Sequence, residues 1–256
     1  MENKIKTPIR GLAGYQAVSR TFTYGITLAA FPLLIAYEIG FPILNEGRNG
    51  IEVILQKIAT LFGILPDELG IPLLLIALVS GSLLAIRHEA RKYGAIDIQP
   101  SFFFMTLNEA VLLSFVVFMS VYLLCYGNLI LPFQHGIPPF GEILLKFTRG
   151  AGGGFFEELV MRVILLGGLV RIFQHFTKHE LASKIFAVVI IALLFSAVHY
   201  VHVFGLVPRN PFTPQGFSAL FLLGIAYGTI YLKRGFATAA WTHTFVNLWI
   251  LINVFA

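Results

Sequence analysis

Long apolar runs separated by short polar gaps dominate the sequence. A transmembrane helix needs about 20 mostly apolar residues to cross the hydrocarbon core of a bilayer. The pattern therefore predicts an all-α, polytopic transmembrane helical bundle of about seven spans. The predicted spans lie near residues 21–44, 69–87, 102–126, 152–173, 184–204, 215–232 and 236–255.

Two stretches between these spans have a character of their own. Segment 51–65 is apolar but too short to span, and it contains Glu52 and Lys57, so we expect a short interfacial or re-entrant helix there. Segment 127–151 is expected to lie outside the membrane and leads into the glycine-rich run 150–154. Because glycine weakens helices, we expect this run to break the helix and to lie at the interface or line water.

Composition agrees with a membrane protein. The chain is 57% hydrophobic and 12% charged, whereas soluble proteins have about 25% charged residues. We therefore expect residues 1–256 to form a single integral membrane domain whose main partner is the lipid bilayer. The net charge of +5 does not indicate nucleic acid, because the basic residues lie in short gaps and form no stripe with interleaved aromatics.

The distribution of positive charge predicts the orientation. Cytoplasmic segments of membrane proteins carry an excess of Lys and Arg. With a cytoplasmic N-terminus and seven spans, twelve basic residues lie inside and only five outside. We therefore expect the N-terminus in the cytoplasm and the C-terminus outside. The five outside residues are Arg48, Lys57, Lys146, Arg149 and Arg209.

Ionisable residues within the spans are the candidate functional residues, because a charge in hydrocarbon is costly and usually marks a site. Glu157, Glu158 and Arg162 lie early in the fourth span. Glu158 and Arg162 are one helical turn apart and can neutralise each other, which leaves Glu157 to face another helix or a water-filled cavity. Alternatively, both acids are charges at the interfacial start of a helix. Glu38 and Glu109 are lone acids in the first and third spans.

Two further polar pairs lie in later spans at i, i+4 spacing, which places each pair on one helix face. Phe195 and His199 are late in the fifth span, and His243 and Asn247 are within the last. Each imidazole could instead be a structural hydrogen-bonding group. Together with Glu157, the three clusters offer a general base, two imidazoles and an amide, which suits hydrolysis of an acyl group.

The order EExxxR, FxxxH, HxxxN on successive spans resembles the CAAX-protease and bacteriocin-processing family, also called Abi, of glutamate-dependent intramembrane endopeptidases. The resemblance covers about residues 150–250 and is expected to mark the catalytic core. Each motif alone is weak, but the three in order are specific. The matching residues are Glu157, Glu158, Arg162, Phe195, His199, His243 and Asn247.

The resemblance implies a role for each matched residue. Glu157 would activate water as the general base, and His199 would help hold that water. His243 and Asn247 would form the oxyanion site. The other three would support the geometry, with Glu158 and Arg162 as an ion pair and Phe195 packed behind the site.

The resemblance also implies the cofactor, the partners and the location. No HExxH motif is present, so we expect metal-free chemistry; a zinc site on Glu157, His199 and His243 is the alternative. The expected substrate is a peptide or protein, lipidated in the CAAX-processing members, and other members process C-terminal or bacteriocin peptides. The compact chain is similar to bacterial members, which suggests the bacterial cytoplasmic membrane.

The predicted spans place the candidate residues at different depths, and two other functions fit the same residues. By the predicted spans, Glu157 and His199 lie near the outer ends of their helices, whereas His243 lies roughly 10 Å from the inner end of the last helix. Convergence requires either different helix boundaries or a displaced last helix. The alternatives to a protease are a non-catalytic scaffold or bacteriocin immunity protein and an ion-coupled transporter.

Overall fold

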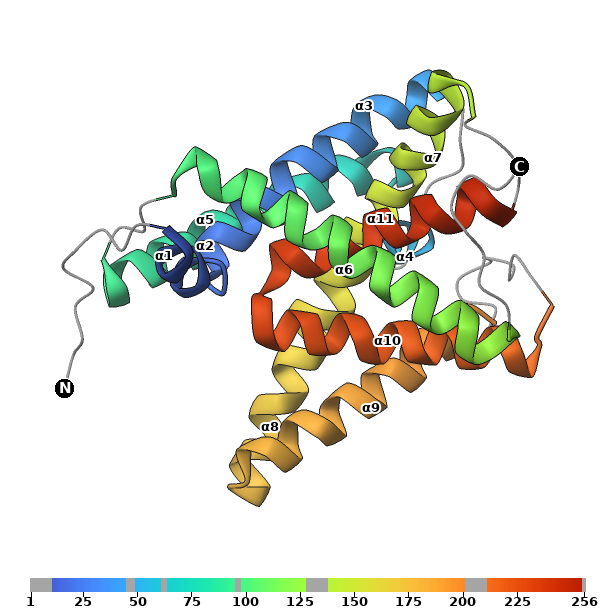
Figure 1. The fold of residues 1–256 in the computed structure, drawn as a ribbon. Coiled ribbons are helices and arrows are strands. Elements are labelled where there is room, and N and C mark those ends of the chain that lie inside the picture. Colours follow the sequence, from blue (N-terminus) through green and yellow to red (C-terminus); the bar gives the residue numbers. More distant parts are fainter. Residues whose placement is uncertain are drawn as a thin grey trace.

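A computed structural model of the chain describes residues 11–44, 49–60, 64–94, 98–127, 138–200 and 211–254. Every regular element in these ranges is helical (Figure 1). The α-helices are α1 (Gly11–Val18), α2 (Phe22–Gly25), α3 (Ile35–Leu44), α4 (Gly50–Ala59), α5 (Gly70–Tyr93), α6 (Pro100–Tyr126), α7 (Phe140–Gly152), α8 (Gly167–Thr177), α9 (Glu180–Val198), α10 (Pro214–Arg234) and α11 (Phe236–Val254). The wider π-helical segments are η1 (Ile26–Leu34), η3 (Gly153–Glu157) and η4 (Leu159–Leu166), and η2 (Asp67–Leu69) is a short 3-10 turn.

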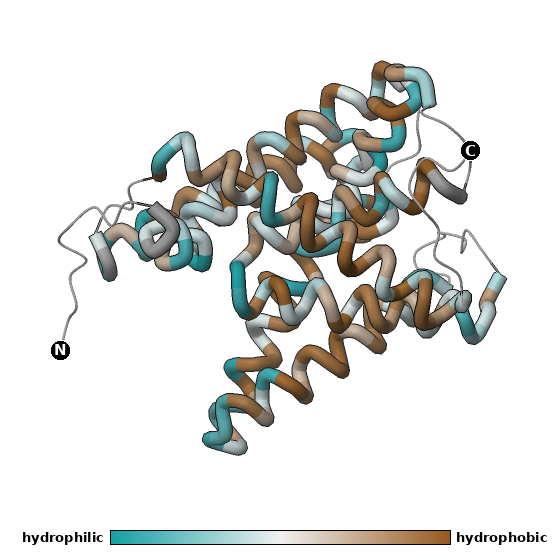
Figure 2. Tube along the Cα trace, viewed as in Figure 1, coloured by the Kyte–Doolittle hydropathy of each residue, from teal (hydrophilic) through white to brown (hydrophobic). Residues whose placement is uncertain are grey.

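The structure confirms an all-α polytopic bundle. Within the described residues, six continuous helices are long and apolar enough to cross a membrane, and α11 is a shorter apolar helix. Each of the seven predicted runs therefore has its helix, although residues 201–204 and 255 of the predicted spans lie outside the described part of the chain. Hydrophobic residues cover the helices over most of their length (Figure 2). Many large apolar side chains are exposed, which suits contact with lipid.

The expectation for the short apolar segment is confirmed in part. Residues Gly50–Ala59 form α4, which is too short to span, and its first-turn residues Ile51 and Glu52 are buried. The helix packs against α5 and η3. Residues 60, 64 and 65 of the predicted segment are not helical, and residues 61–63 lie outside the described residues.

The expectation that the glycine run breaks the helix is wrong, although Gly150 and Gly153 do line a cavity. One continuous helix extends over Phe140–Thr177, so residues 150–154 are helical, and residues 140–151 of the segment expected to lie outside the membrane belong to this helix. Gly150 and Gly154 face α11, where a Cβ on Gly150 would lie 2.9 Å from the backbone oxygen of Thr244 and one on Gly154 only 2.6 Å from that of Ala240. The glycines let two helices approach closely, as small residues do in membranes.

Helix α11 is the centre of the bundle and packs against α6, α7, α10, η1 and η3 (Figure 1). It follows α10 after a single residue, Gly235, whose φ of +88° reverses the chain. Arg234 holds this turn by donating to both carboxylate oxygens of Glu109 on α6, at 2.6 and 2.9 Å. The lone acid of the third span therefore has a partner 125 residues away.

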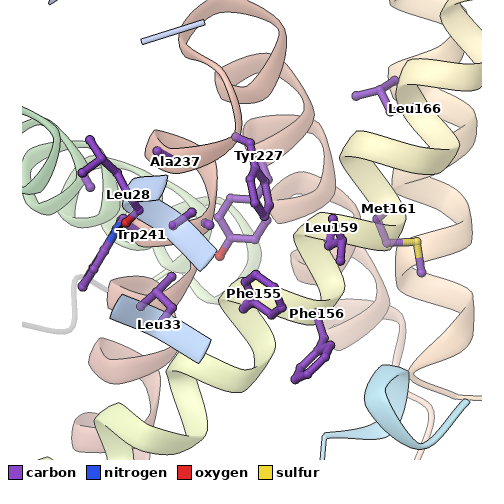
Figure 3. Close-up of a cluster of buried hydrophobic side chains, with 14 of the residues drawn as sticks. Leu28, Leu33, Phe155, Phe156, Leu159, Met161, Leu166, Tyr227, Ala237 and Trp241 are labelled. Atoms are coloured by element: carbon purple, nitrogen blue, oxygen red, sulfur yellow. Dashed lines mark hydrogen bonds between the residues drawn. The ribbon is translucent and has the colours of Figure 1, made fainter. Parts of the chain in front are cut away.

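The buried core lies beside α11. Figure 3 draws the cluster in which side chains from η1, η3, η4, α10 and α11 meet. Phe155 and Phe156 directly precede the Glu157-Glu158 pair, and their rings are in edge contact with centroids 5.0 Å apart. The two carboxylates are therefore carried by a segment whose other side chains are firmly packed.

Candidate active site

Glu157 lies in the middle of the helix Phe140–Thr177, not near its end. One carboxylate oxygen, Oε2, is 3.9 Å from Nε2 of His199 and 3.9 Å from Nε2 of His243. The three sequence motifs thus converge, and the apparent mismatch in depth disappears because this helix begins at Phe140. Glu157 ends the π-helical segment η3, and such segments are frequent at functional sites.

Glu158 is fully buried, and its two oxygens have different partners. Oε1 accepts a hydrogen bond from Nδ1 of His243 at 2.9 Å, and Oε2 lies 3.2 Å from Nε of Arg162. The ion pair expected from the i, i+4 spacing is therefore present. Arg162 is also fully buried and lies over the rings of Phe195, at 5.1 Å, and Tyr227, at 5.9 Å.

The imidazoles of His199 and His243 are each oriented by a hydrogen bond at Nδ1. Nδ1 of His199 lies 2.7 Å from the backbone oxygen of Phe195, and because a carbonyl only accepts, Nδ1 carries the hydrogen. Nε2 of a neutral His199 is then an acceptor directed at the Glu157 side. In His243, the hydrogen bond to Glu158 likewise assigns a hydrogen to Nδ1 and turns Nε2 toward Glu157.

Aromatic rings fix the positions of the imidazoles. Tyr227 stacks on His243 with ring centroids 4.4 Å apart and an angle of 15° between planes. Phe195 contacts His199 at 4.9 Å and His243 at 6.0 Å, both edge to face. Phe195 thus lies behind the pair, where the sequence analysis placed it. Tyr227 was missed, because nothing in the α10 sequence distinguishes it from an ordinary core aromatic.

These residues line a cavity of about 200 Å³. Glu157, His199, His243 and Asn247 all contribute to its wall. Asn247 lies so close to η3 that its Nδ2 would be 2.8 Å from a Cβ at Gly153, which explains why a glycine occupies that position. The apolar part of the wall consists of Phe41, Phe195, Leu220, Leu223, Ile250 and Leu251.

Sequence reasoning also missed Asn49. Its Nδ2 donates a hydrogen bond of 2.9 Å to Oε1 of Glu157, 108 residues further along the chain. The only local signal is that Asn precedes a helix start, as an N-cap residue does. That signal predicts where α4 begins and says nothing about a contact with Glu157.

A metal centre was the alternative for these residues. Within the described part of the chain, no group of three His, Cys, Asp or Glu side chains could hold a metal ion. The 3.9 Å separations of Glu157 from each histidine also allow a small molecule between them.

Residues 139–249 match the family model described as Type II CAAX prenyl endopeptidase Rce1-like. The match is consistent with the CAAX protease family. No curated protein and no solved structure matches the chain. The Rce1-like domain contains all seven motif residues and supports a general activity as an intramembrane endopeptidase. It does not include Tyr37 and Asn49, which complete the wall of the same cavity.

Proposed function

We propose that this protein cleaves peptide bonds with a water molecule activated by Glu157. The observation that carries the proposal is the convergence of His199 and His243 on one oxygen of Glu157, each at 3.9 Å. A water oxygen placed about 2.8 Å from each of these groups fits such a spacing. It would also lie against the cavity wall where a peptide carbonyl can approach.

In the proposed reaction, Glu157 takes a proton from water while the water oxygen forms a bond to the carbonyl carbon. The carbonyl oxygen becomes an oxyanion, which His243 and Asn247 stabilise by donating hydrogen bonds. The C–N bond then breaks, and Glu157 returns its proton to the leaving amine. His199 accepts the second hydrogen of the water at Nε2 and so fixes its direction of attack.

The surroundings of His243 suit a donor at this position. Because Nδ1 donates to Glu158, a hydrogen on Nε2 as well would make the ring an imidazolium. Such a positive ring would lie between the carboxylates of Glu157 and Glu158 and flat against the Tyr227 face, an arrangement that attracts cations. Arg162 holds the other oxygen of Glu158 and keeps that carboxylate turned to the ring.

The family model and the cavity support a proposal for the substrate. We propose that the substrate is a peptide at the membrane surface, with a prenylated C-terminal peptide as the first candidate because the family model is that of a prenyl endopeptidase. The apolar side of the cavity could accept a lipid chain. We further propose metal-free catalysis and a cytoplasmic N-terminus in the bacterial cytoplasmic membrane.

The test uses the purified protein in liposomes with three probes. They are an S-farnesylated peptide ending in a CAAX tetrapeptide, the same peptide without the prenyl group, and a pool of unmodified peptides, with products identified by mass spectrometry. We expect the wild type to cleave at least one probe and the Glu157→Gln and His199→Ala variants to leave it intact.

Two surface substitutions serve as matched controls. Glu180→Gln and His175→Ala make the same chemical changes at exposed positions outside the cavity, and we expect both to cleave at the wild-type rate. Cleavage by Glu157→Gln at that rate, or no cleavage of any probe by the wild type, would contradict the proposal.

A further inference from the structure

The side chain of Asn49 makes two hydrogen bonds with opposite roles. Its Oδ1 accepts from the backbone N–H of Ile51 at 2.9 Å, which caps the start of α4. Its Nδ2 donates to Oε1 of Glu157 at 2.9 Å. A flipped amide would turn its donor toward an N–H and its acceptor toward a carboxylate, so the two partners together fix the orientation of the amide.

The position of Asn49 is itself fixed by two helices. Its backbone N–H donates to the hydroxyl of Tyr37 on α3 at 2.9 Å, and that hydroxyl donates in turn to the buried carboxylate of Glu52. The Tyr37 ring packs on Phe156, the neighbour of Glu157, with centroids 5.7 Å apart. These contacts therefore hold Asn49 against the segment that carries Glu157.

The contact with Asn49 gives the two carboxylate oxygens of Glu157 different partners. Oε1 is held by Asn49, and Oε2 points to both histidines. Without a donor at Oε1, the carboxylate is free to rotate about its last bond and to turn either oxygen away from the histidines. Among the preferred N-cap residues, only Asn combines an acceptor for the cap with a strong N–H donor.

We propose that Asn49 is a positioning residue that holds Glu157 in the orientation needed to activate water, so that the start of α4 is part of the catalytic apparatus. The inference rests on the proposed function of Glu157. It also means that the Rce1-like domain of residues 139–249 is incomplete without the preceding part of the chain.

Three substitutions separate this role from capping. Asn49→Ser and Asn49→Asp keep a capping oxygen but lose the amide N–H that reaches Glu157, whereas Asn49→Ala loses both. On the probe that the wild type cleaves fastest, we expect Ser and Asp to lower kcat by about 10- to 100-fold, the effect of losing a hydrogen bond to a charged group. KM should stay within about twofold, since Asn49 acts on the base and not on the bound peptide.

The thermal midpoint should be close to that of the wild type in Asn49→Ser and lowered in Asn49→Ala, which loses the cap, and in Asn49→Asp, where two carboxylates face each other. Asn108→Ser, at an exposed position on α6, is the control for the substitution itself and should behave as the wild type. Wild-type kcat in both Asn49→Ser and Asn49→Asp would overturn the proposal. A raised KM with unchanged kcat would overturn it as well, because Asn49 would then be a substrate contact.

A second measurement does not depend on activity. With Cys125 replaced by Ala, cysteines introduced at positions 49 and 157 should be joined by a short bifunctional thiol reagent, whereas cysteines at 108 and 157 should not. Failure to join 49 and 157 would overturn the contact. If Glu157→Gln is inactive while Asn49→Ser is fully active, only this inference fails; if Glu157→Gln is active, the proposed function fails.

Discussion

Tyr227 lies flat on His243, with ring centroids 4.4 Å apart and planes 15° from parallel. Its hydroxyl is buried and has no hydrogen-bond partner among the described residues. The stacked ring, and not the hydroxyl, is therefore the part of Tyr227 that contributes to the site. An unpaired buried hydroxyl costs about 1–3 kcal/mol.

The first prediction concerns this ring. Tyr227→Phe keeps the stack and removes the unpaired hydroxyl, so we expect wild-type cleavage and an equal or higher thermal midpoint. Tyr227→Leu removes the stack, and we expect kcat to fall by about tenfold as His243 loses its support. Peptide cleavage and thermal unfolding in detergent check both. An active Leu variant together with an inactive Phe variant would mean that the hydroxyl, not the ring, is required.

The second prediction concerns the buried pair of Glu158 and Arg162. Arg162→Met leaves Glu158 charged and buried without its partner, which should cost about 3–5 kcal/mol of stability. The double variant Glu158→Gln, Arg162→Met removes both charges and keeps an oxygen for His243, so we expect most of the stability to return. Cleavage should stay low in both variants. In Arg162→Met, Arg162 no longer holds the Glu158 carboxylate against His243, and in the double variant that carboxylate is absent. Equal free energies of unfolding for the wild type, Arg162→Met and the double variant would show that the pair is not buried as described.

The third prediction concerns the glycine run. A methyl group at Gly154 would collide with the backbone of Ala240, so Gly154→Ala should destabilise the protein by about 1–3 kcal/mol. Gly168→Ala is the matched control on the same long helix, since a Cβ there meets no atom within 4 Å. It should leave the unfolding midpoint unchanged or raise it slightly, because Ala favours helix. Equal midpoints in the two variants would mean that η3 and α11 are not in close contact.

The helices and the three motifs were predictable because both depend on local patterns. Apolar runs of span length and i, i+4 pairs such as His243 and Asn247 are read directly from neighbouring residues. The start of the long helix at Phe140 was not predictable, because glycine weakens an isolated helix and only the contact with α11 explains residues 150–154. The same holds for contacts between distant segments. Arg234 and Asn49 have polar partners more than 100 residues away, and the sequence contains no local trace of them.

The fourth prediction concerns orientation in the membrane. In a Cys125→Ala background, single cysteines at Gly94 and Lys178 should react with a membrane-impermeant thiol reagent only in inverted vesicles. A cysteine added after Ala256 should react only in intact cells. This pattern is that of a cytoplasmic N-terminus and seven spans, as the positive charges indicate. Reaction of all three positions from the same side would contradict it.

The fifth prediction concerns metal. With Glu157 as the base and no metal in the reaction, cleavage should persist after dialysis against a strong chelator, and added zinc should not raise the rate. The control is a zinc peptidase treated in the same way, which should lose its activity. Loss of cleavage on chelation with recovery on adding zinc would support the alternative in which Glu157, His199 and His243 bind the metal.

The role of Glu157 as the general base is tested most directly by comparing the cleavage rates of wild type and Glu157→Gln on one peptide. The amide has nearly the same shape and can still accept from Asn49 at its oxygen, but it cannot take a proton from water. We predict a fall in kcat of about 10²- to 10⁴-fold with an unchanged unfolding midpoint. A Glu157→Gln protein that cleaves the peptide at the wild-type rate would contradict this role.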